Sequence, residues 1–210
     1  MLIILDLDHT LLNTASLKKE LCKSLINFGV SQKLFKNVYQ KLRKDNPYSH
    51  ELFLDYLSKE KEINRKAAKA KLEKFSKKMR KYLYPEAIWF LKKMRKNGAK
   101  LVLLSYGNAK FQKMKIKNIK LEPFFDKVII TEKKKTKSVV KMVNNQKQKI
   151  FFIDDHPEEI KEIYQNCKNV IPIFIKHKEN SKSLEPKMAS KIITFPNFRQ
   201  MEHYLKSHYE

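Results

Sequence analysis

The chain begins MLIILDLDHTLL over residues 1–12, and this stretch decides the fold. The apolar run Leu2–Leu5 predicts a buried β-strand, and Asp6 and Asp8 follow it directly. Because residues i and i+2 of a strand point to the same face, the two carboxylates are placed to share one site. An ionised carboxylate resists burial unless something compensates its charge. A divalent cation with a transferring phosphoryl group would compensate it, whereas a solvated acidic turn is the alternative interpretation.

Short apolar runs recur downstream and alternate with helical patterns. The runs LVLLS, VIIT and IFFI are continuously apolar, which is typical of parallel strands covered on both faces. The predicted strands are Leu2–Asp6, Lys100–Ser105, Lys127–Thr131, Ile150–Asp154, Val170–Phe174 and Lys191–Phe195. The predicted helices between them are Pro85–Lys96, Asn108–Ile119, Thr136–Asn145 and Pro157–Asn166. This alternation predicts an α/β fold, a doubly wound parallel sheet with a Rossmann-like core. The polar segment Lys176–Met188 predicts an exposed loop.

Residues 14–84 interrupt this alternation and show helical patterns without a convincing strand. Their apolar residues repeat at helical spacing, which favours a small helical bundle over a cofactor site. The predicted helices cover Leu17–Phe28, Leu34–Leu42, a segment that Ser49 is placed to cap, and Arg65–Tyr82. The chain is therefore expected to divide into a catalytic core, residues 1–13 and 85–210, and a helical insertion, residues 14–84.

The charge of the chain is strongly positive. It has 46 basic and 22 acidic residues, for a net charge of +24, and residues 14–84 hold 19 of the basic and seven of the acidic ones. Such a charge indicates a nucleic acid or another polyanion as one candidate partner. Only five basic residues are arginines, however, and arginine is the usual choice for phosphate recognition. A compositional bias toward lysine is therefore favoured over nucleic-acid binding.

Several classes of protein are not indicated by the sequence. Cys22 and Cys167 lie far apart, form no metal-binding spacing and are expected to be reduced thiols. No apolar run reaches the roughly 18 residues of a membrane span. The apolar N-terminal stretch is interrupted by Asp6 and Asp8 and has no basic residues before it, unlike a signal peptide. We therefore expect a cytoplasmic protein with no membrane partner.

The pattern D-x-D-x-T, from Asp6 to Thr10, resembles motif I of the haloacid dehalogenase superfamily, whose members are mostly phosphatases. Ser105, at the end of the next predicted core strand, resembles the phosphate-binding residue of motif II, although a serine there can also be a helix cap. Asp154 and Asp155, after the apolar run IFFI, resemble the acidic pair of motif IV. Their alternative role is helix capping, which explains one acid better than two.

Motif III of this superfamily is a lysine near the start of a helix, and the run TEKKKTKS holds four candidates. Lys135 is the best match and Lys137 the next, and Lys133 and Lys134 remain alternatives. The residues outside the motif would form an ordinary solvated lysine run. With the four motifs in the superfamily's order, the resemblance covers residues 1–13 and 85 to about 175.

The resemblance implies a Mg²⁺-dependent hydrolysis of phosphomonoesters. Asp6 would attack phosphorus and form an aspartyl-phosphate, and Asp8 would act as general acid and then general base. Ser105 and Lys135 would stabilise the phosphoryl oxygens. The implied metal ligands are Asp6, the backbone carbonyl of Asp8, and Asp155. Asp154 would hold the motif III lysine or bind the metal in place of Asp155.

The resemblance also implies a role for the insertion and a class of substrate. An insertion between motifs I and II is a C1-type cap that closes over the site and selects a small phosphorylated substrate. True dehalogenases lack the second acid, so Asp8 favours phosphate esters over halides. The chain departs from the family at His9, where glycine is frequent, and at Asn13, where aspartate is frequent. Alternatives are a phosphatase for nucleotides or nucleic-acid ends, and a non-catalytic nucleic-acid-binding module. The sequence gives no oligomeric state.

Overall fold

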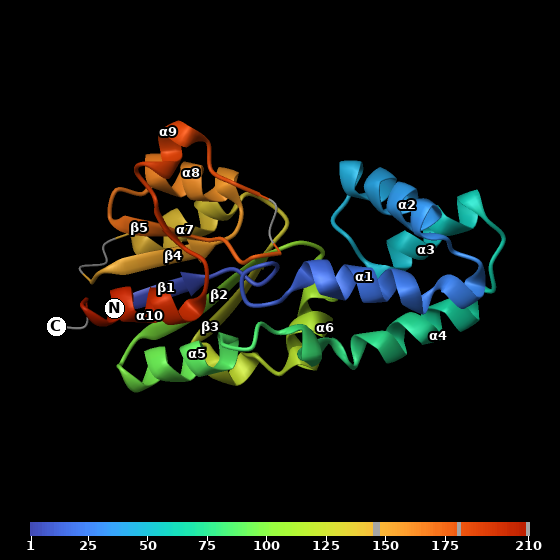
Figure 1. Cartoon of the computed structure of the whole chain (residues 1–210), viewed down its shortest axis with the longest axis horizontal. Helices are drawn as coiled ribbons and strands as arrows, with labels where there is room; N and C mark the ends of the chain where they lie inside the picture. Colours follow the sequence, from blue (N-terminus) through green and yellow to red (C-terminus); the bar gives the residue numbers. More distant parts are fainter. Residues whose placement is uncertain (145–147, 180–181, 209–210) are drawn as a thin grey trace.

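The computed structural model describes residues 1–144, 148–179 and 182–208. Its core is a six-stranded sheet in the order β3-β2-β1-β4-β5-β6, and every pair of neighbouring strands is parallel (Figure 1). The strands are β1 (Leu2–Leu5), β2 (Lys100–Tyr106), β3 (Lys127–Thr131), β4 (Ile150–Asp154), β5 (Val170–Ile175) and β6 (Ile193–Phe195). The predicted doubly wound α/β fold is confirmed.

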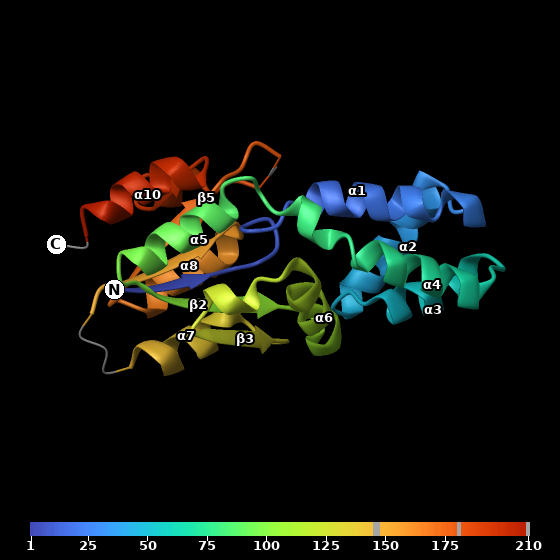
Figure 2. The same ribbon diagram turned by 90° about the horizontal axis from the view of Figure 1, so that it is seen from below.

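Helices cover both faces of the sheet, so the central strands are buried on both sides (Figures 1 and 2). The core helices are α5 (Ala87–Lys96), α6 (Ala109–Ile119), α7 (Lys135–Val143), α8 (Pro157–Asn166), α9 (Pro186–Ala189) and α10 (Phe198–Lys206). One apolar cluster joins α5, α6 and α10 to one face, with Ile3 and Leu5 of β1 among its members. A second joins α7 and α8 to the other face, where Leu2 and Ile4 point. The alternation of β1 side chains thus stabilises both layers.

Residues between β1 and β2 form helices with an apolar cluster of their own. These helices are α1 (Thr14–Ser24), α2 (Gln32–Asp45), α3 (His50–Glu60) and α4 (Arg65–Ser76), with short 3₁₀ turns at Ile26–Phe28 and Met79–Tyr82. Side chains of Asn13, Ser31, Ser49 and Asn64 accept hydrogen bonds from the first turns of α1, α2, α3 and α4. Figure 1 shows this helical insertion beyond the carboxyl ends of the strands.

Some element boundaries differ from the predictions. The predicted helix Arg65–Tyr82 is divided, because α4 ends at Ser76 and a 3₁₀ turn begins at Met79. The predicted helix ending at Asn145 ends at Val143 in the structure, and Asn145 itself lies outside the described residues. No helix in the described part of the chain combines the length and the apolar composition needed to cross a bilayer.

The segment predicted to be an exposed loop, Lys176–Met188, has buried residues. His177 is buried and stacks on Tyr84 with 3.5 Å between ring centroids, and its Nε2 donates to the backbone carbonyl of Thr10 at 2.9 Å. The composition of the segment does not predict this contact, because the contact depends on a single residue, His177, in an otherwise polar segment. The segment thereby supports the loop that follows β1, which carries the candidate site.

Candidate active site

The carboxyl ends of β1, β2 and β4 open into a cavity of about 750 Å³ that the helical insertion covers from the other side. Open α/β sheets bind ligands at this end of their strands. From the core, the lining includes Asp6, Asp8, Lys115, Lys135, Asp154 and Asp155; from the insertion, it includes Lys18, Leu21, Tyr39, Arg43 and Tyr48. The cavity therefore joins the predicted motif residues to the insertion.

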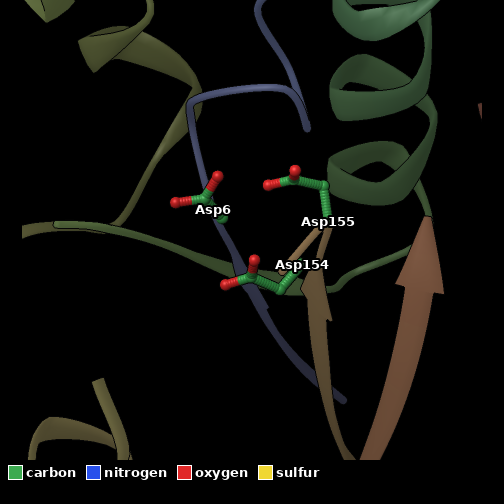
Figure 3. Close-up of side chains that lie close together, drawn as sticks. All are labelled: Asp6, Asp154 and Asp155. Carbon is green, nitrogen blue, oxygen red and sulfur yellow. The ribbon is translucent and has the colours of Figure 1, made fainter. Parts of the chain in front are cut away.

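Asp6, Asp154 and Asp155 form the acidic centre of this cavity. All three are buried, and each offers a carboxylate oxygen within 4.8 Å of the other two. Figure 3 shows the carboxylate of Asp155 turned toward Asp6, with Asp154 below the two. Carboxylate oxygens are the ligands that Mg²⁺ prefers, and three buried acids at this spacing fit a divalent cation.

Lys135, at the first residue of α7, lies between two of these acids. Its Nζ is 2.5 Å from Asp6 Oδ1 and 2.7 Å from Asp154 Oδ2, and its side chain is only 4% exposed. The other three lysines of the run are exposed, and Lys134 pairs with Glu162 on α8. Among the four candidates, Lys135 is therefore the one that contacts the acidic centre.

The two acids of the motif IV pair have different partners. Asp154 Oδ2 accepts from Lys135, and its Oδ1 accepts from the backbone N–H of His156 at 2.8 Å. Asp155 Oδ2 instead lies 2.9 Å from Nζ of Lys182. Asp154 is therefore the acid of this pair that holds Lys135, as the resemblance implied, whereas the choice of Asp155 over Asp154 as the direct metal ligand stays a prediction. Their roles in catalysis stay predictions.

The three carboxylates of the acidic centre are buried close together, and this raises their pKa values. Burial raises the pKa of Asp6 to about 6; Lys135 counteracts this, while Asp154 and Asp8 add repulsion. Burial also raises the pKa of Asp154, against the effect of Lys135, and of Asp155, which Asp6 repels. A divalent cation among these carboxylates would favour their ionised forms, which is the second reason that the site fits a metal.

Asp8 lines the same cavity, but its carboxylate is turned toward α6. Nζ of Lys115 is 2.6 Å from both of its oxygens, Thr14 Oγ1 donates to Oδ1 at 2.7 Å, and Gln112 Nε2 donates to Oδ2 at 3.1 Å. Burial raises the pKa of Asp8, but these four contacts outweigh burial and hold it well below its ordinary value. The two acids of motif I thus share a cavity while each has its own lysine. The predicted metal contact through the carbonyl of Asp8 stays a prediction.

His9 stands at a backbone position that suits glycine. Its φ is +62°, in the left-handed region that residues with a Cβ rarely adopt. Its N–H donates to the carbonyl of Leu12 at 2.8 Å and to Thr14 Oγ1 at 3.2 Å, which holds the tight turn after Asp8. This geometry explains why glycine is frequent there in the family that motif I resembles. The same turn brings Thr14 to Asp8.

Ser105 is fully buried at the carboxyl end of β2, and its hydroxyl has no hydrogen-bond partner among the described residues. The cavity lining takes Tyr106 and Gly107 from this segment instead. An orphaned buried hydroxyl fits a missing ligand, but its place just outside the lining leaves the phosphate-binding role of Ser105 a prediction.

Gly107 lets Gln112 reach Asp8. A Cβ at residue 107 would stand 2.6 Å from Nε2 of Gln112, and the φ of +145° also favours glycine. With the glycine in place, Gln112 Nε2 donates to the backbone carbonyl of Tyr106 at 2.9 Å as well as to Asp8. The turn between β2 and α6 therefore positions a polar side chain at the site.

The sequence interpretation missed Lys115, Gln112 and Lys182. A signal for the first two was present, because they stand in the buried stripe of α6 together with Phe111, Ile116 and Ile119. Polar residues on the apolar face of a helix near a motif need a partner. Lys182 gives no such signal, since it belongs to a polar segment rich in lysine.

Comparisons with known proteins give the family. A family model described as haloacid dehalogenase-like hydrolase matches residues 3–164. No curated protein matches the chain. A haloacid dehalogenase-like hydrolase from Burkholderia xenovorans LB400 is similar in structure, with a TM-score of 0.77 and 16% identity over 96% of this chain and 94% of that one.

Two further solved structures have similar folds. A protein assigned as a β-phosphoglucomutase from Thermotoga maritima has a TM-score of 0.69 and 15% identity, over 98% of each chain. The L-2-haloacid dehalogenase from Xanthobacter autotrophicus, with chloropropionic acid covalently bound, has a TM-score of 0.66 and 12% identity, also over 98% of each chain. At these identities the likeness shows the fold. The family match, which spans most of the sequence, shows that the chain belongs to the haloacid dehalogenase-like hydrolases.

Proposed function

We propose that this hydrolase is a Mg²⁺-dependent phosphomonoesterase that works through an aspartyl-phosphate on Asp6. The observation that carries the proposal is the setting of Asp6. It is a buried carboxylate that faces the cavity, with Lys135 at 2.5 Å and two further carboxylates close by. A phosphoryl group brought to such a nucleophile needs cationic groups around it, because both reactants are anions.

The residues that would hold Mg²⁺ are Asp6 and Asp155, with Asp154 beside them. When bound, Mg²⁺ supplies positive charge that reduces the repulsion between the nucleophile and the phosphate and orients the two. Lys135 supplies a second positive charge from the opposite element, α7, at a position fixed by its contact with Asp154. These two charges make the site suited to a dianionic phosphoryl group.

In the first half of the reaction, an oxygen of Asp6 forms a bond to phosphorus while the bond from phosphorus to the leaving oxygen breaks. The leaving alkoxide takes a proton from the carboxyl of Asp8, and the alcohol departs. Lys135 donates to the phosphoryl oxygens, on which negative charge gathers. The product of this half is a mixed anhydride between Asp6 and phosphate.

In the second half, water attacks the phosphorus of that anhydride and loses a proton to the carboxylate of Asp8. The bond between phosphorus and the Asp6 oxygen breaks, which restores the Asp6 carboxylate and releases inorganic phosphate. Asp8 thereby regains the proton that it gave in the first half.

Asp8 also favours a phosphate ester over a haloacid as the substrate. A halide leaves as an anion without a proton, so a dehalogenase needs no acid at this position. An alkoxide leaves poorly unless it is protonated, and Asp8 lines the cavity with Asp6. The likeness to a solved dehalogenase concerns the fold, whereas the second acid concerns the chemistry.

The cavity supports a small anionic substrate, with the insertion acting as its cap. On the insertion side, Lys18 lies 3.5 Å above the ring of Tyr39, and Arg43 lines the same wall. Neither Lys18 nor Arg43 forms an ion pair with a carboxylate in the described part of the chain. These cations are therefore available to an anionic group of a phosphorylated metabolite whose phosphate lies at Asp6.

The test is hydrolysis of an aryl phosphate and of a panel of phosphorylated metabolites by the purified protein with Mg²⁺. We expect Asp6→Asn and Asp8→Asn each to abolish phosphate release. The exposed acid Asp45, at the end of α2, gives the matched control Asp45→Asn, which should keep full activity. Full activity in either site variant, or release of halide from 2-haloacids instead of phosphate, would contradict the proposal.

The net charge of +24 favours a second candidate substrate, a nucleotide or a nucleic-acid end. A salt series separates this candidate from a small metabolite, because binding along a polyanion weakens steeply with ionic strength. Turnover of a 5′-phosphorylated oligonucleotide that exceeds turnover of every small phosphate would favour it. Tight, salt-sensitive binding of DNA without turnover would favour a binding module.

A further inference from the structure

The active-site cavity shares side chains with a second cavity on the helical insertion. Lys18 of α1 and Tyr39 and Arg43 of α2 line the active-site cavity, and the same three side chains line the second one, which measures about 680 Å³. We call these three side chains the shared wall and the second cavity the outer cavity. The rest of the outer cavity is lined by amide and lysine side chains of α2. A molecule held at Asp6 that is long enough to reach the shared wall therefore has space beyond it.

The outer cavity is cationic. Beside Lys18 and Arg43 it takes Lys41 and Lys44 from α2, and in the described part of the chain no carboxylate lines it. Lys41 pairs with Glu60 of α3 at 2.5 Å. The other three cations form no ion pair among the residues that the structure describes. The cavity thus gathers positive charge that the protein itself does not neutralise.

The position of Lys18 is unfavourable for a charged group. Burial lowers the pKa of its ammonium group, and repulsion from Arg43 and Lys36 lowers it further. Its Nζ lies 3.5 Å from the centre of the Tyr39 ring, a contact that offsets part of this cost. An anion at the shared wall would attract Lys18 and Arg43 together and favour the charged form of Lys18.

Both helices that carry the shared wall are tied to the core. On α1, Thr14 Oγ1 donates to Asp8 at 2.7 Å, and Lys18 stands one helical turn further along the same face. The tyrosine of the shared wall packs against Tyr48 with 5.4 Å between ring centroids, and Tyr48 packs against Phe111 of α6 with 5.1 Å. The two cations are therefore held at a defined position relative to the acidic centre.

We propose that Lys18 and Arg43 bind a second phosphate of the substrate, so that the preferred substrate is a small bisphosphorylated molecule. The proposal rests on the phosphomonoesterase function proposed above, which places the phosphate that is cleaved at Asp6. A phosphomonoester carries about two negative charges at pH 7, and the guanidinium of arginine donates two parallel hydrogen bonds to such a group. Lys18 occupies a face of the Tyr39 ring on which a nucleobase would stack, which favours a bisphosphate over a nucleic-acid end.

The experiment measures kcat/KM for linear alkanediols of increasing length, each with a phosphate at both ends or at one end only. The bisphosphate has two equivalent ends, so its value is halved, and the ratio of the two values then isolates the far phosphate. We expect this ratio to peak at one chain length at roughly 100-fold, because two charge-assisted hydrogen bonds contribute about tenfold each. Lys18→Met and Arg43→Met should each lower the peak ratio about tenfold.

The matched controls are Lys19→Met on α1 and Lys33→Met on α2, which remove the same charge from exposed positions that line neither cavity. They should leave the ratio unchanged, which separates a bound phosphate from attraction by the net charge of +24. Lys18→Arg keeps the charge and should retain most of the preference. Urea unfolding identifies any variant that fails to fold, and Arg43→Met, which changes an exposed residue, then carries the comparison.

A ratio close to one at every chain length, or an equal fall in the control variants, would overturn the proposal. Faster turnover of a 5′-phosphorylated oligonucleotide than of every bisphosphate would also overturn it.

Failure of the proposed function has a different signature, since phosphate release would then not depend on Asp6 for any substrate. Calorimetry of bisphosphate binding decides the matter in that case. Binding that Lys18→Met weakens and Lys19→Met leaves unchanged supports the second phosphate site, and binding that is the same in all three proteins overturns it.

Discussion

Asp6→Asn in the metal-free protein tests the charge balance of the acidic centre through the stability of the fold. Burial raises the pKa of Asp6 from 3.8 to about 6. The attraction of Lys135 opposes this rise, and repulsion from Asp154 and Asp8 adds to it. A shift of this size corresponds to about 3 kcal/mol. At pH 7 the ionised Asp6 therefore destabilises the native protein by about that amount relative to its protonated form.

The direction in which the free energy of unfolding changes with pH follows from proton uptake by Asp6. Between pH 6 and pH 4 the native protein holds a proton on Asp6 that the unfolded chain does not, so the free energy of unfolding rises as the pH falls. Four histidines, His9, His50, His156 and His177, have lowered pKa values because they are buried, and they oppose this trend. They are present in both proteins, so the difference between wild type and Asp6→Asn reports on Asp6 together with the neighbours whose pKa values it shifts, chiefly Asp155.

The assay is urea unfolding with a chelator at pH 7, 6, 5 and 4. We expect the wild type to gain about 2 kcal/mol relative to Asp6→Asn between pH 7 and pH 4, since the unfolded chain also begins to bind the proton near pH 4. Excess Mg²⁺ should shrink this gain, because a bound cation favours the ionised carboxylate. A difference that stays constant with pH, with or without Mg²⁺, would refute the account of the acidic centre.

Three further predictions concern the surroundings of the site. Gly107→Ala should displace Gln112, since its Cβ would stand 2.6 Å from Nε2, and should cost roughly 1–3 kcal/mol of stability with a loss of activity, measured by urea unfolding and phosphate release. Arg43→Ala should raise KM severalfold for phosphates that carry a second anionic group and leave KM for an aryl phosphate unchanged; equal KM values would contradict an anion contact in the insertion. Lys182→Gln should tighten Mg²⁺ binding severalfold in calorimetry, because Lys182 is a cation 2.9 Å from Asp155, and weaker binding would show that it supports the site instead.

The fold could be predicted from local patterns of apolar and polar residues in the sequence. Buried parallel strands such as β4 are continuous apolar runs, and β1 places Asp6 at its carboxyl end whatever the rest of the chain does. Lys135 was distinguished from its neighbours because its position starts a helix, α7, that follows β3. Such features depend on residues close in sequence, which is why pattern reasoning reached them.

The partners of Asp8 and Asp155 depend on contacts between distant residues. Lys115 is 107 residues from Asp8, and Lys182 is 27 residues from Asp155 in a segment whose composition predicts solvent exposure. Lysine is the commonest charged residue of this chain, so one more lysine carries no signal by itself. The signal for Lys115 was its position on the buried face of α6, which the sequence interpretation did not use.

The most direct test of the account is the covalent state of Asp6 during turnover. Wild-type protein turning over an aryl phosphate with Mg²⁺ is quenched in acid, digested, and its peptides are analysed by mass spectrometry. We expect a phosphoryl group on the peptide that contains Asp6, lost on treatment with hydroxylamine and absent from Asp6→Asn. Rapid phosphate release without any such adduct, also in Asp8→Asn where the intermediate should accumulate if it forms, would contradict nucleophilic catalysis by Asp6.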